Sequence, residues 1–116
     1  MVTARKLLEQ VEYGPCAFFC QQAAEKSLKA LLYLRGIKTF GHSLVNLLAR
    51  VVQTGFPEPD AALNEAALSL DEHYTTPRYP DAFKERIAAE HYTREIAEEA
   101  MEWANLLMQY SGENLA

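Results

Sequence analysis

The strongest constraint on the fold is one long stretch whose small and apolar side chains recur at helical spacing. This stretch lies between Pro15 and Arg35, and its apolar positions are Cys16, Cys20, Ala23, Ala24, Ser27, Leu28, Leu31 and Leu34. Residues spaced three and four apart share one face of an α-helix, and an apolar face must be buried against a partner. Proline is tolerated in the first turn, and Gly36 suits a left-handed cap. The sequence therefore predicts a helix from Pro15 to Arg35.

Four further segments show the same period. They are residues 2–12, 43–54, 60–74 and 93–108. Ser43, Asp60 and Thr93 open the last three, and their side chains suit the N-cap of a helix. No segment alternates apolar and polar residues over several positions, so no sheet is expected. We predict an all-α fold, an antiparallel up-and-down bundle of four or five helices in one domain spanning residues 1–116.

Composition limits the class of protein. The chain has 116 residues, of which 49% are apolar. A chain of this length can bury about two-thirds of its unfolded surface without a metal or a disulfide. No apolar run reaches the ~18 residues of a membrane-spanning helix, and no apolar signal region follows residues 1–6. We expect a cytoplasmic protein without a membrane contact, a metal or a cofactor. Cys16 and Cys20 share one helix face, which favours core packing.

The charge is acidic overall and unevenly distributed. The net charge is −5 and the isoelectric point is about 5.2, which argues against a broad nucleic-acid binder. Residues 78–94 nevertheless hold four Lys or Arg, three acids and His91, whereas residues 95–102 hold four glutamates and no cation. A small, locally basic site is therefore compatible with the composition.

The segment from Thr75 to Tyr92 departs from the helical pattern. It contains an Arg-Tyr-Pro-Asp block at 78–81, followed by Arg86 and His91. A small bundle has little structural need for such a segment, and long ordered loops in compact domains are usually functional. We therefore expect the chemistry of the protein in this segment.

Several blocks together resemble the HEPN domain family. They are residues 16–32 with their Gln-Gln-Ala-Ala-Glu-Lys run, residues 41–48, residues 70–74 and the Arg-Tyr-Pro-Asp block. The first helix is shorter than is usual in the family. The resemblance implies a helical bundle that commonly dimerises and is often encoded beside a minimal nucleotidyltransferase, as a toxin–antitoxin or substrate-binding module. Many members are metal-independent ribonucleases with an Arg-x(4–6)-His motif, and others bind nucleotides or partner proteins.

Arg86 and His91 fit the Arg-x4-His spacing of that motif. Histidine titrates near neutral pH and can take a proton from a ribose 2′-hydroxyl, while arginine can hold a phosphate. On one continuous helix, positions five apart point ~140° apart, so convergence needs a bend or a second copy of the chain. The alternative is that Arg86 is a surface charge and His91 packs near a helix cap.

Arg78 and Tyr79 have two interpretations. Arg78 can grip a phosphate of a nucleotide or RNA while Tyr79 stacks on a base. Equally, Tyr79 can fill a gap over the bundle, and Arg78 can pair with Asp81 or with an acid of the preceding helix.

The remaining polar residues have structural interpretations. We expect His42 to hold its loop to the core, and Glu25, Lys26 and Lys29 to form a solvated face. No second histidine stands at a ligand spacing from His73, so no metal site is predicted there. The four glutamates at 95, 98, 99 and 102 face solvent or dock a basic partner. If they dock a basic partner, the protein is a non-catalytic interaction bundle, which is the alternative function.

Overall fold

The computed structural model describes residues 2–9, 12–75 and 93–115, which form a helical bundle. The helices are α1 (Val2–Glu9), α2 (Tyr13–Leu34), α3 (Leu44–Gln53), α4 (Ala61–Thr75) and α6 (Arg94–Leu115). No strand occurs within these ranges. The predicted all-α bundle is therefore confirmed.

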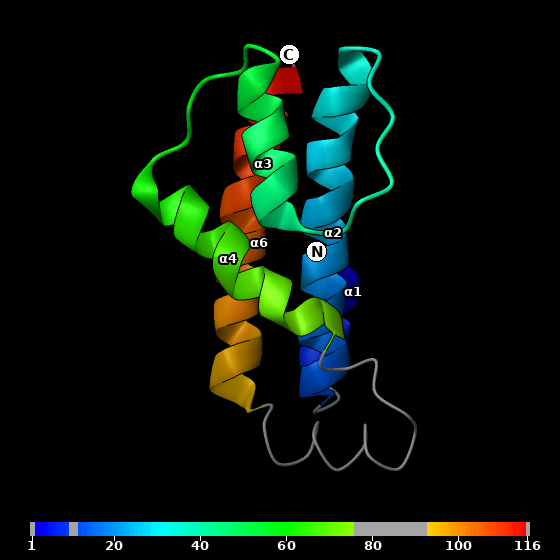
Figure 1. Cartoon of the computed structure of the whole chain (residues 1–116). Helices are drawn as coiled ribbons and strands as arrows, with labels where there is room; N and C mark the ends of the chain where they lie inside the picture. Colours follow the sequence, from blue (N-terminus) through cyan, green and yellow to red (C-terminus); the bar gives the residue numbers. More distant parts are fainter. Residues whose placement is uncertain (1, 10–11, 76–92, 116) are drawn as a thin grey trace.

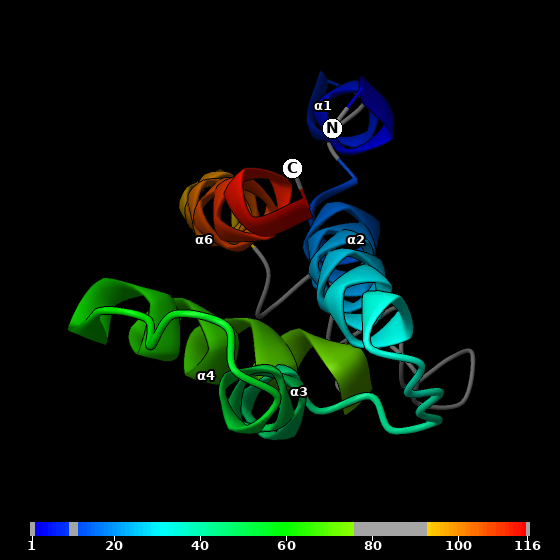
Figure 2. The same cartoon turned by 90° about the horizontal axis from the view of Figure 1, so that it is seen from above.

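The helices form three layers, and α2 belongs to the middle one (Figures 1 and 2). The long helices α2 and α6 lie side by side in the middle layer, α1 covers one side, and α3 with α4 covers the other. The helices α2 and α3 run in the same direction, because residues 35–43 return along the bundle as an extended loop. In Figure 1, helix α4 begins to the left of α3, after a descending connection, and crosses obliquely in front of α6 to the lower part of α2.

The core is built from the inward faces of all five described helices. Fully buried leucines come from α2, α3, α4 and α6, namely Leu28, Leu31, Leu32, Leu44, Leu70 and Leu107. Alanines without exposed surface lie on both long helices, Ala17 and Ala24 on α2 and Ala97, Ala100 and Ala104 on α6. Small side chains let helix axes approach closely, which suits the extensive contact between α2 and α6.

The helix ends follow the predicted signals with small shifts. Helix α1 is described as far as Glu9, with Glu12 outside it, and α2 begins at Tyr13, ahead of the predicted Pro15. The shift at α2 is possible because proline is compatible with the whole first turn. Gly36 (φ 72°) and Gly55 (φ 106°) adopt the left-handed conformation that ends a helix.

Two of the predicted N-caps are described in detail. The Asp60 carboxylate accepts a hydrogen bond from Leu63 N at 2.9 Å. The Ser43 hydroxyl accepts one from Asn46 N at 3.2 Å. Asp71 of α4 adds a second cap to α3, because its carboxylate accepts from Leu44 N at 2.6 Å and from Ser43 Oγ at 3.0 Å. One carboxylate therefore fixes α4 against the start of α3.

The buried face of α6 is wider than the predicted stripe. Ile96, Trp103 and Met108 are only half-buried, whereas Met101 and Tyr110 are buried. The Tyr110 hydroxyl donates to the Pro57 carbonyl at 2.5 Å. Burial raises the pKa of Tyr110. This bond ties the end of α6 to the connection between α3 and α4.

The Tyr110 hydrogen bond gives a testable pH dependence. We expect Tyr110→Phe to lower the free energy of unfolding by about 1 kcal/mol near neutral pH, because one net hydrogen bond is lost. A phenol whose pKa is raised by folding stabilises the folded state below the unfolded pKa of about 10, and this contribution is lost as pH rises through the folded pKa. Urea unfolding between neutral and alkaline pH measures both effects.

The control is Tyr33→Phe, because Tyr33 is 74% exposed. That variant should match the unsubstituted protein at every pH. If the free energy of unfolding of the wild type falls no more steeply than that of Tyr110→Phe above pH ~10, the role given to the Tyr110 hydroxyl is wrong.

Candidate functional site

The four predicted site residues lie outside the described ranges. Arg78, Tyr79, Arg86 and His91 all fall within residues 76–92. The structure describes the residues on either side, up to Thr75 at the end of α4 and again from Thr93 before α6. The Thr93 hydroxyl accepts a hydrogen bond from Ile96 N at 3.2 Å, so the predicted cap of the last helix is confirmed.

A buried polar cluster occupies the face of α2 next to the loop 35–43. Its centre is Glu25, which is only 5% exposed. Both carboxylate oxygens lie 3.2 Å from Nδ1 of His42, and Oε2 accepts from Nζ of Lys29 at 3.0 Å. The prediction that Glu25 belongs to a solvated face is therefore wrong. A carboxylate can be buried here because a cation one turn away and an imidazole both satisfy it.

His42 is held through its backbone as well as its ring. Gln21, which is fully buried, donates from Nε2 to the His42 carbonyl at 2.9 Å. The His42 ring stacks on the Tyr74 ring with centroids 4.7 Å apart and planes 17° apart. Tyr74 in turn lies 6.2 Å from Phe18, between ring centroids. The expectation that His42 holds its loop to the core is confirmed.

The Glu25 carboxylate fixes the chemistry of the His42 ring. A carboxylate accepts hydrogen bonds and does not donate them, so Nδ1 must carry the hydrogen in this contact. In the neutral ring Nε2 is then the acceptor. The His42 side chain is 48% exposed, so the loop presents at the surface an imidazole that Glu25 of α2 orients.

A cavity opens between this loop and α3, and we call it the loop groove. Its volume is about 360 Å³, and it is lined by Ile37, Lys38, Thr39, Gly41, His42, Ser43, Asn46, Leu47 and Arg50. The lining contains two full cations, two hydroxyls and an amide, and it contains no acid. Hydroxyl and amide groups beside cations are the usual partners of phosphate oxygens in proteins.

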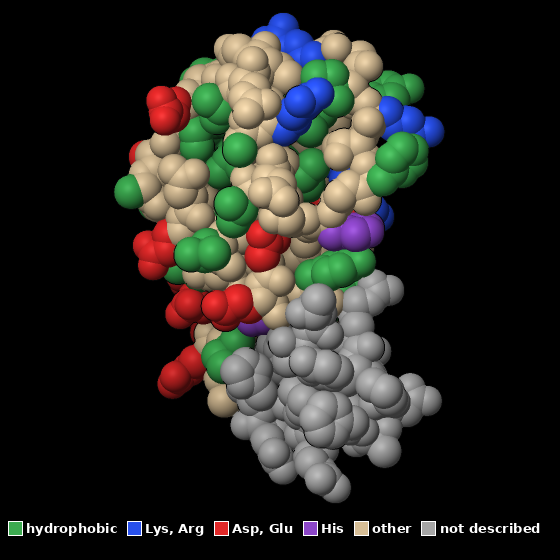
Figure 3. All heavy atoms as spheres, viewed as in Figure 1, with side chains coloured by type: hydrophobic (Ala, Val, Ile, Leu, Met, Phe, Trp, Pro, Cys, Tyr) green, Lys and Arg blue, Asp and Glu red, His purple; other side chains and the backbone are tan. Residues whose placement is uncertain are grey.

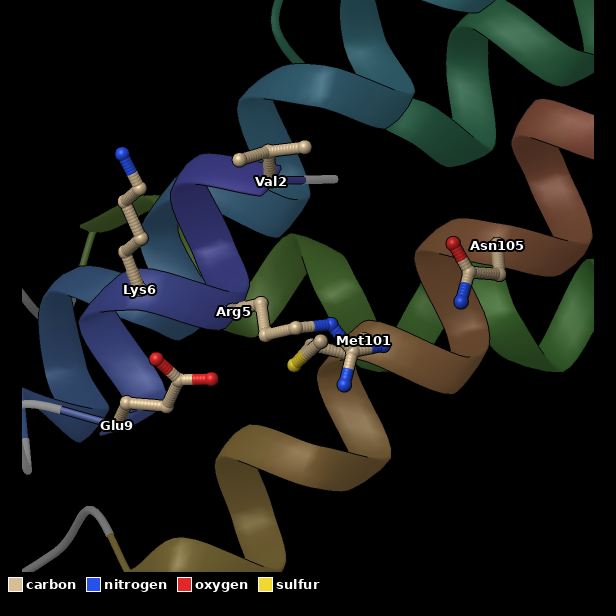
Figure 4. Close-up of a pocket in the computed structure, with 6 residues that line it drawn as sticks. All are labelled: Val2, Arg5, Lys6, Glu9, Met101 and Asn105. Carbon is tan, nitrogen blue, oxygen red and sulfur yellow. The ribbon is translucent and has the colours of Figure 1, made fainter.

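A second cavity lies between α1 and α6 (Figure 4). It has a volume of about 480 Å³ and is lined by Val2, Arg5, Lys6, Glu9, Met101 and Asn105. Arg5 extends from α1 toward Met101 on α6, while Glu9 adds a negative charge from the same helix. The mixed charge makes this cavity a weaker candidate for an anionic ligand than the loop groove.

The two cysteines pack in the core as predicted. Both are free and buried, and Cys16 Sγ donates to the Ala4 carbonyl at 3.3 Å. A hydrogen bond with Cys16, together with burial, raises the pKa of Cys20. Cys20 therefore stays a thiol rather than a nucleophilic thiolate.

Residues 2–9, 12–75 and 93–115 contain neither a cluster of metal ligands nor a membrane-spanning helix. No group of three or more His, Cys, Asp or Glu side chains in these ranges is arranged to hold a metal ion. None of the helices described there is both long enough and apolar enough to cross a membrane.

Comparison with known proteins places the chain in a family. A sequence model described as the HEPN domain matches residues 1–115. The chain belongs to the HEPN family. The crystal structure of TT1696 from Thermus thermophilus superposes with a TM-score of 0.82 at 40% identity, over 97% of this chain and 87% of that one. ST0689, described as an archaeal HEPN homologue, gives a TM-score of 0.76 at 32% identity, over 98% and 87% of the two chains.

One relative has a name that bears on function. The "Putative toxin MJ1304" of Methanocaldococcus jannaschii is 30% identical over 113 residues, which is 91% of this chain and 74% of that protein. The similarity covers α2, the loop 35–43 and α3, so the polar cluster lies within the shared region.

Sequence analysis missed Gln21 and Glu25 as buried residues, although a signal was present. Residues 21, 25, 28 and 32 are spaced by three or four positions, so Gln21 and Glu25 share a face with Leu28 and Leu32. Both polar residues are therefore placed toward the core by the same period that places the leucines.

The cluster predicts a measurable coupling between Glu25 and His42. We expect Glu25→Ala to lower the free energy of unfolding by about 2 kcal/mol, because it leaves His42 and Lys29 without their partner in a desolvated site. A double-mutant cycle with His42→Ala should give a coupling of about 1 kcal/mol. Urea denaturation of the four proteins measures both quantities.

Lys26→Ala is the matched control, since Lys26 is exposed on the same helix turn. It should change stability by less than ~0.5 kcal/mol. Additive effects of the Glu25 and His42 substitutions would show that the two side chains do not depend on each other.

Proposed function

We propose that this protein is the RNA-binding, toxin-like half of a two-component module whose other half is a minimal nucleotidyltransferase. The observation that carries the proposal is the Arg-x4-His spacing of Arg86 and His91 in a chain of the HEPN family. The archaeal relative carries the name "Putative toxin MJ1304", which also favours a toxin-like role.

The proposed reaction is metal-independent cleavage of RNA. His91 accepts the proton of a ribose 2′-hydroxyl, and the 2′-oxygen attacks the adjacent phosphorus. The bond from phosphorus to the 5′-oxygen breaks, which leaves a 2′,3′-cyclic phosphate and a 5′-hydroxyl that takes up a proton. Arg86 holds the phosphate oxygens while negative charge builds on them. Arg78 and Tyr79 bind the neighbouring nucleotide.

The start of α6 supports an anion in this neighbourhood. His91 lies two residues before Thr93, whose cap opens a 22-residue helix. The N-terminal end of a helix carries unpaired N–H groups and a partial positive charge, which favours a nearby phosphate. A homodimer, which we also propose, supplies a second copy of both side chains if one chain does not bring them together.

The alternative is a non-catalytic interaction bundle. The acidic surface of α6 favours it, because Glu95, Glu98, Glu99 and Glu102 are all exposed. Two of them have partners on the same helix: Glu98 pairs with Arg94 at 2.7 Å, and Glu99 accepts from Trp103 Nε1 at 3.2 Å. In that case α6 docks a basic partner, and a nucleotidyltransferase gene beside this one is not required.

A single-turnover cleavage assay separates the two functions. We expect the protein, in excess over end-labelled single-stranded RNA and in excess chelator, to produce fragments with cyclic-phosphate ends. His91→Ala and Arg86→Ala should each slow cleavage by about a hundredfold or more, since general acid–base catalysis and charge stabilisation each contribute that much.

Arg5→Ala is the matched arginine control, because Arg5 is exposed on α1 and has no part in the proposed reaction. It should cleave at the wild-type rate. If the wild type and His91→Ala leave the RNA equally intact, the ribonuclease proposal is wrong and the interaction bundle remains.

A further inference from the structure

The chain separates its charges by segment. From Lys26 to Pro57 it holds five Lys or Arg, at 26, 29, 35, 38 and 50, and no Asp or Glu. From Glu58 to Thr75 it holds five acids, at 58, 60, 65, 71 and 72, and no Lys or Arg. Figure 3 shows Lys and Arg side chains on the upper part of one face, over the ends of α2 and α3, and most acids on the left and lower parts. An acidic protein therefore presents a local basic surface.

The loop groove lies within this basic surface. Lys38 comes from the loop and Arg50 from the last turn of α3, and both line the same cavity. Both side chains are exposed, and within the described ranges neither forms an ion pair. Their charges are therefore available to an anion.

The nearest acids are already engaged. Asp71 is hydrogen-bonded to Ser43, Leu44 and Val45 at the start of α3. Glu25 is held by His42 and Lys29. Because Asp71 occupies the first N–H groups of α3, the anion site must depend on the two cations rather than on the helix N-terminus.

An exposed aromatic ring lies on the loop that lines the groove. Phe40 is 78% exposed and stands between the lining residues Thr39 and Gly41. Nζ of Lys38 lies 5.6 Å from the centroid of the Phe40 ring. Exposed rings beside cations are typical of surfaces that bind single-stranded nucleic acid, because each base can stack while each phosphate pairs. An acidic peptide provides carboxylates for the cations but gives the ring no base to stack on.

We propose that the loop groove, together with the ring of Phe40, is a binding site for single-stranded RNA, distinct from residues 76–92. Lys38 and Arg50 contact phosphates, and Phe40 stacks on a base. This inference rests on the proposed function, because it takes RNA as the ligand. It adds a surface on the described bundle that selects single strands and holds them by their backbone.

Fluorescence anisotropy with a labelled 12-nucleotide oligouridylate tests the site, in a His91→Ala background that prevents cleavage. The Lys38→Ala/Arg50→Ala pair should weaken binding about tenfold and lower the slope of log affinity against log salt by about 1.4, which corresponds to two phosphate contacts. Phe40→Ala should weaken binding about fivefold or more without changing that slope, because stacking releases no counterions.

The control variants remove similar side chains at sites outside the groove. The Arg5→Ala/Lys6→Ala pair removes the same charge from the α1 cavity in Figure 4, and Leu68→Ala removes an apolar side chain that is 63% exposed. Neither should change affinity by more than twofold. Circular dichroism checks that each variant keeps its helices. If the Lys38→Ala/Arg50→Ala variant does not fold, the two single variants are measured in its place.

The outcomes separate this inference from the proposed function. If the parent protein binds RNA and the groove pair weakens it no more than the α1 pair, the groove inference is wrong and the RNA-binding proposal stands. If the parent protein does not bind RNA at all, both are wrong. If the Lys38→Ala/Arg50→Ala variant keeps its affinity for RNA but no longer binds an acidic protein partner, the groove is a protein-docking surface instead.

Discussion

The functional surface depends on the hydrogen bonds that the buried Glu25 carboxylate accepts from His42 and Lys29. A charge in this position is costly unless each oxygen has a donor, and here the donors come from α2 itself and from the loop before α3. The same contact fixes the His42 ring, and Gln21 fixes the His42 backbone. The end of the loop 35–43 next to α3 is therefore anchored to the side of α2 through His42.

That constraint shapes the surface next to it. Asp71 then caps α3 from α4, so the loop, α3 and α4 are joined by charge-assisted hydrogen bonds rather than by apolar contacts alone. Neither acid pairs with Lys38 or Arg50, so these two cations of the loop groove are free to contact an anionic ligand. The apolar core decides where the helices lie, whereas the buried polar groups decide the shape and charge of the open groove.

Much of the fold could be predicted from the sequence, because it depends on local signals. The period of α2 indicated most of its buried face, although Leu34 is 59% exposed and Ala23 and Ser27 are only half-buried. Gly36 and Gly55 marked helix ends, and Ser43, Asp60 and Thr93 marked helix starts. The cap from Asp71 could not be predicted, since it joins residues that are far apart in the sequence and depends on how α4 crosses α3. The burial of Glu25 was missed because a charged residue was assigned to solvent by type, although its spacing placed it with the leucines. The roles of Arg78, Tyr79, Arg86 and His91 remain sequence predictions, since these residues lie outside the described ranges.

The most direct test of this account is to map RNA on the surface by NMR. Titrating single-stranded RNA into ¹⁵N-labelled protein should shift the backbone amides of residues 37–43 and of α3, and leave those of α1 and of the middle of α4 unchanged. Shifts that avoid the loop groove, or that spread evenly over acidic and basic faces alike, would contradict the account.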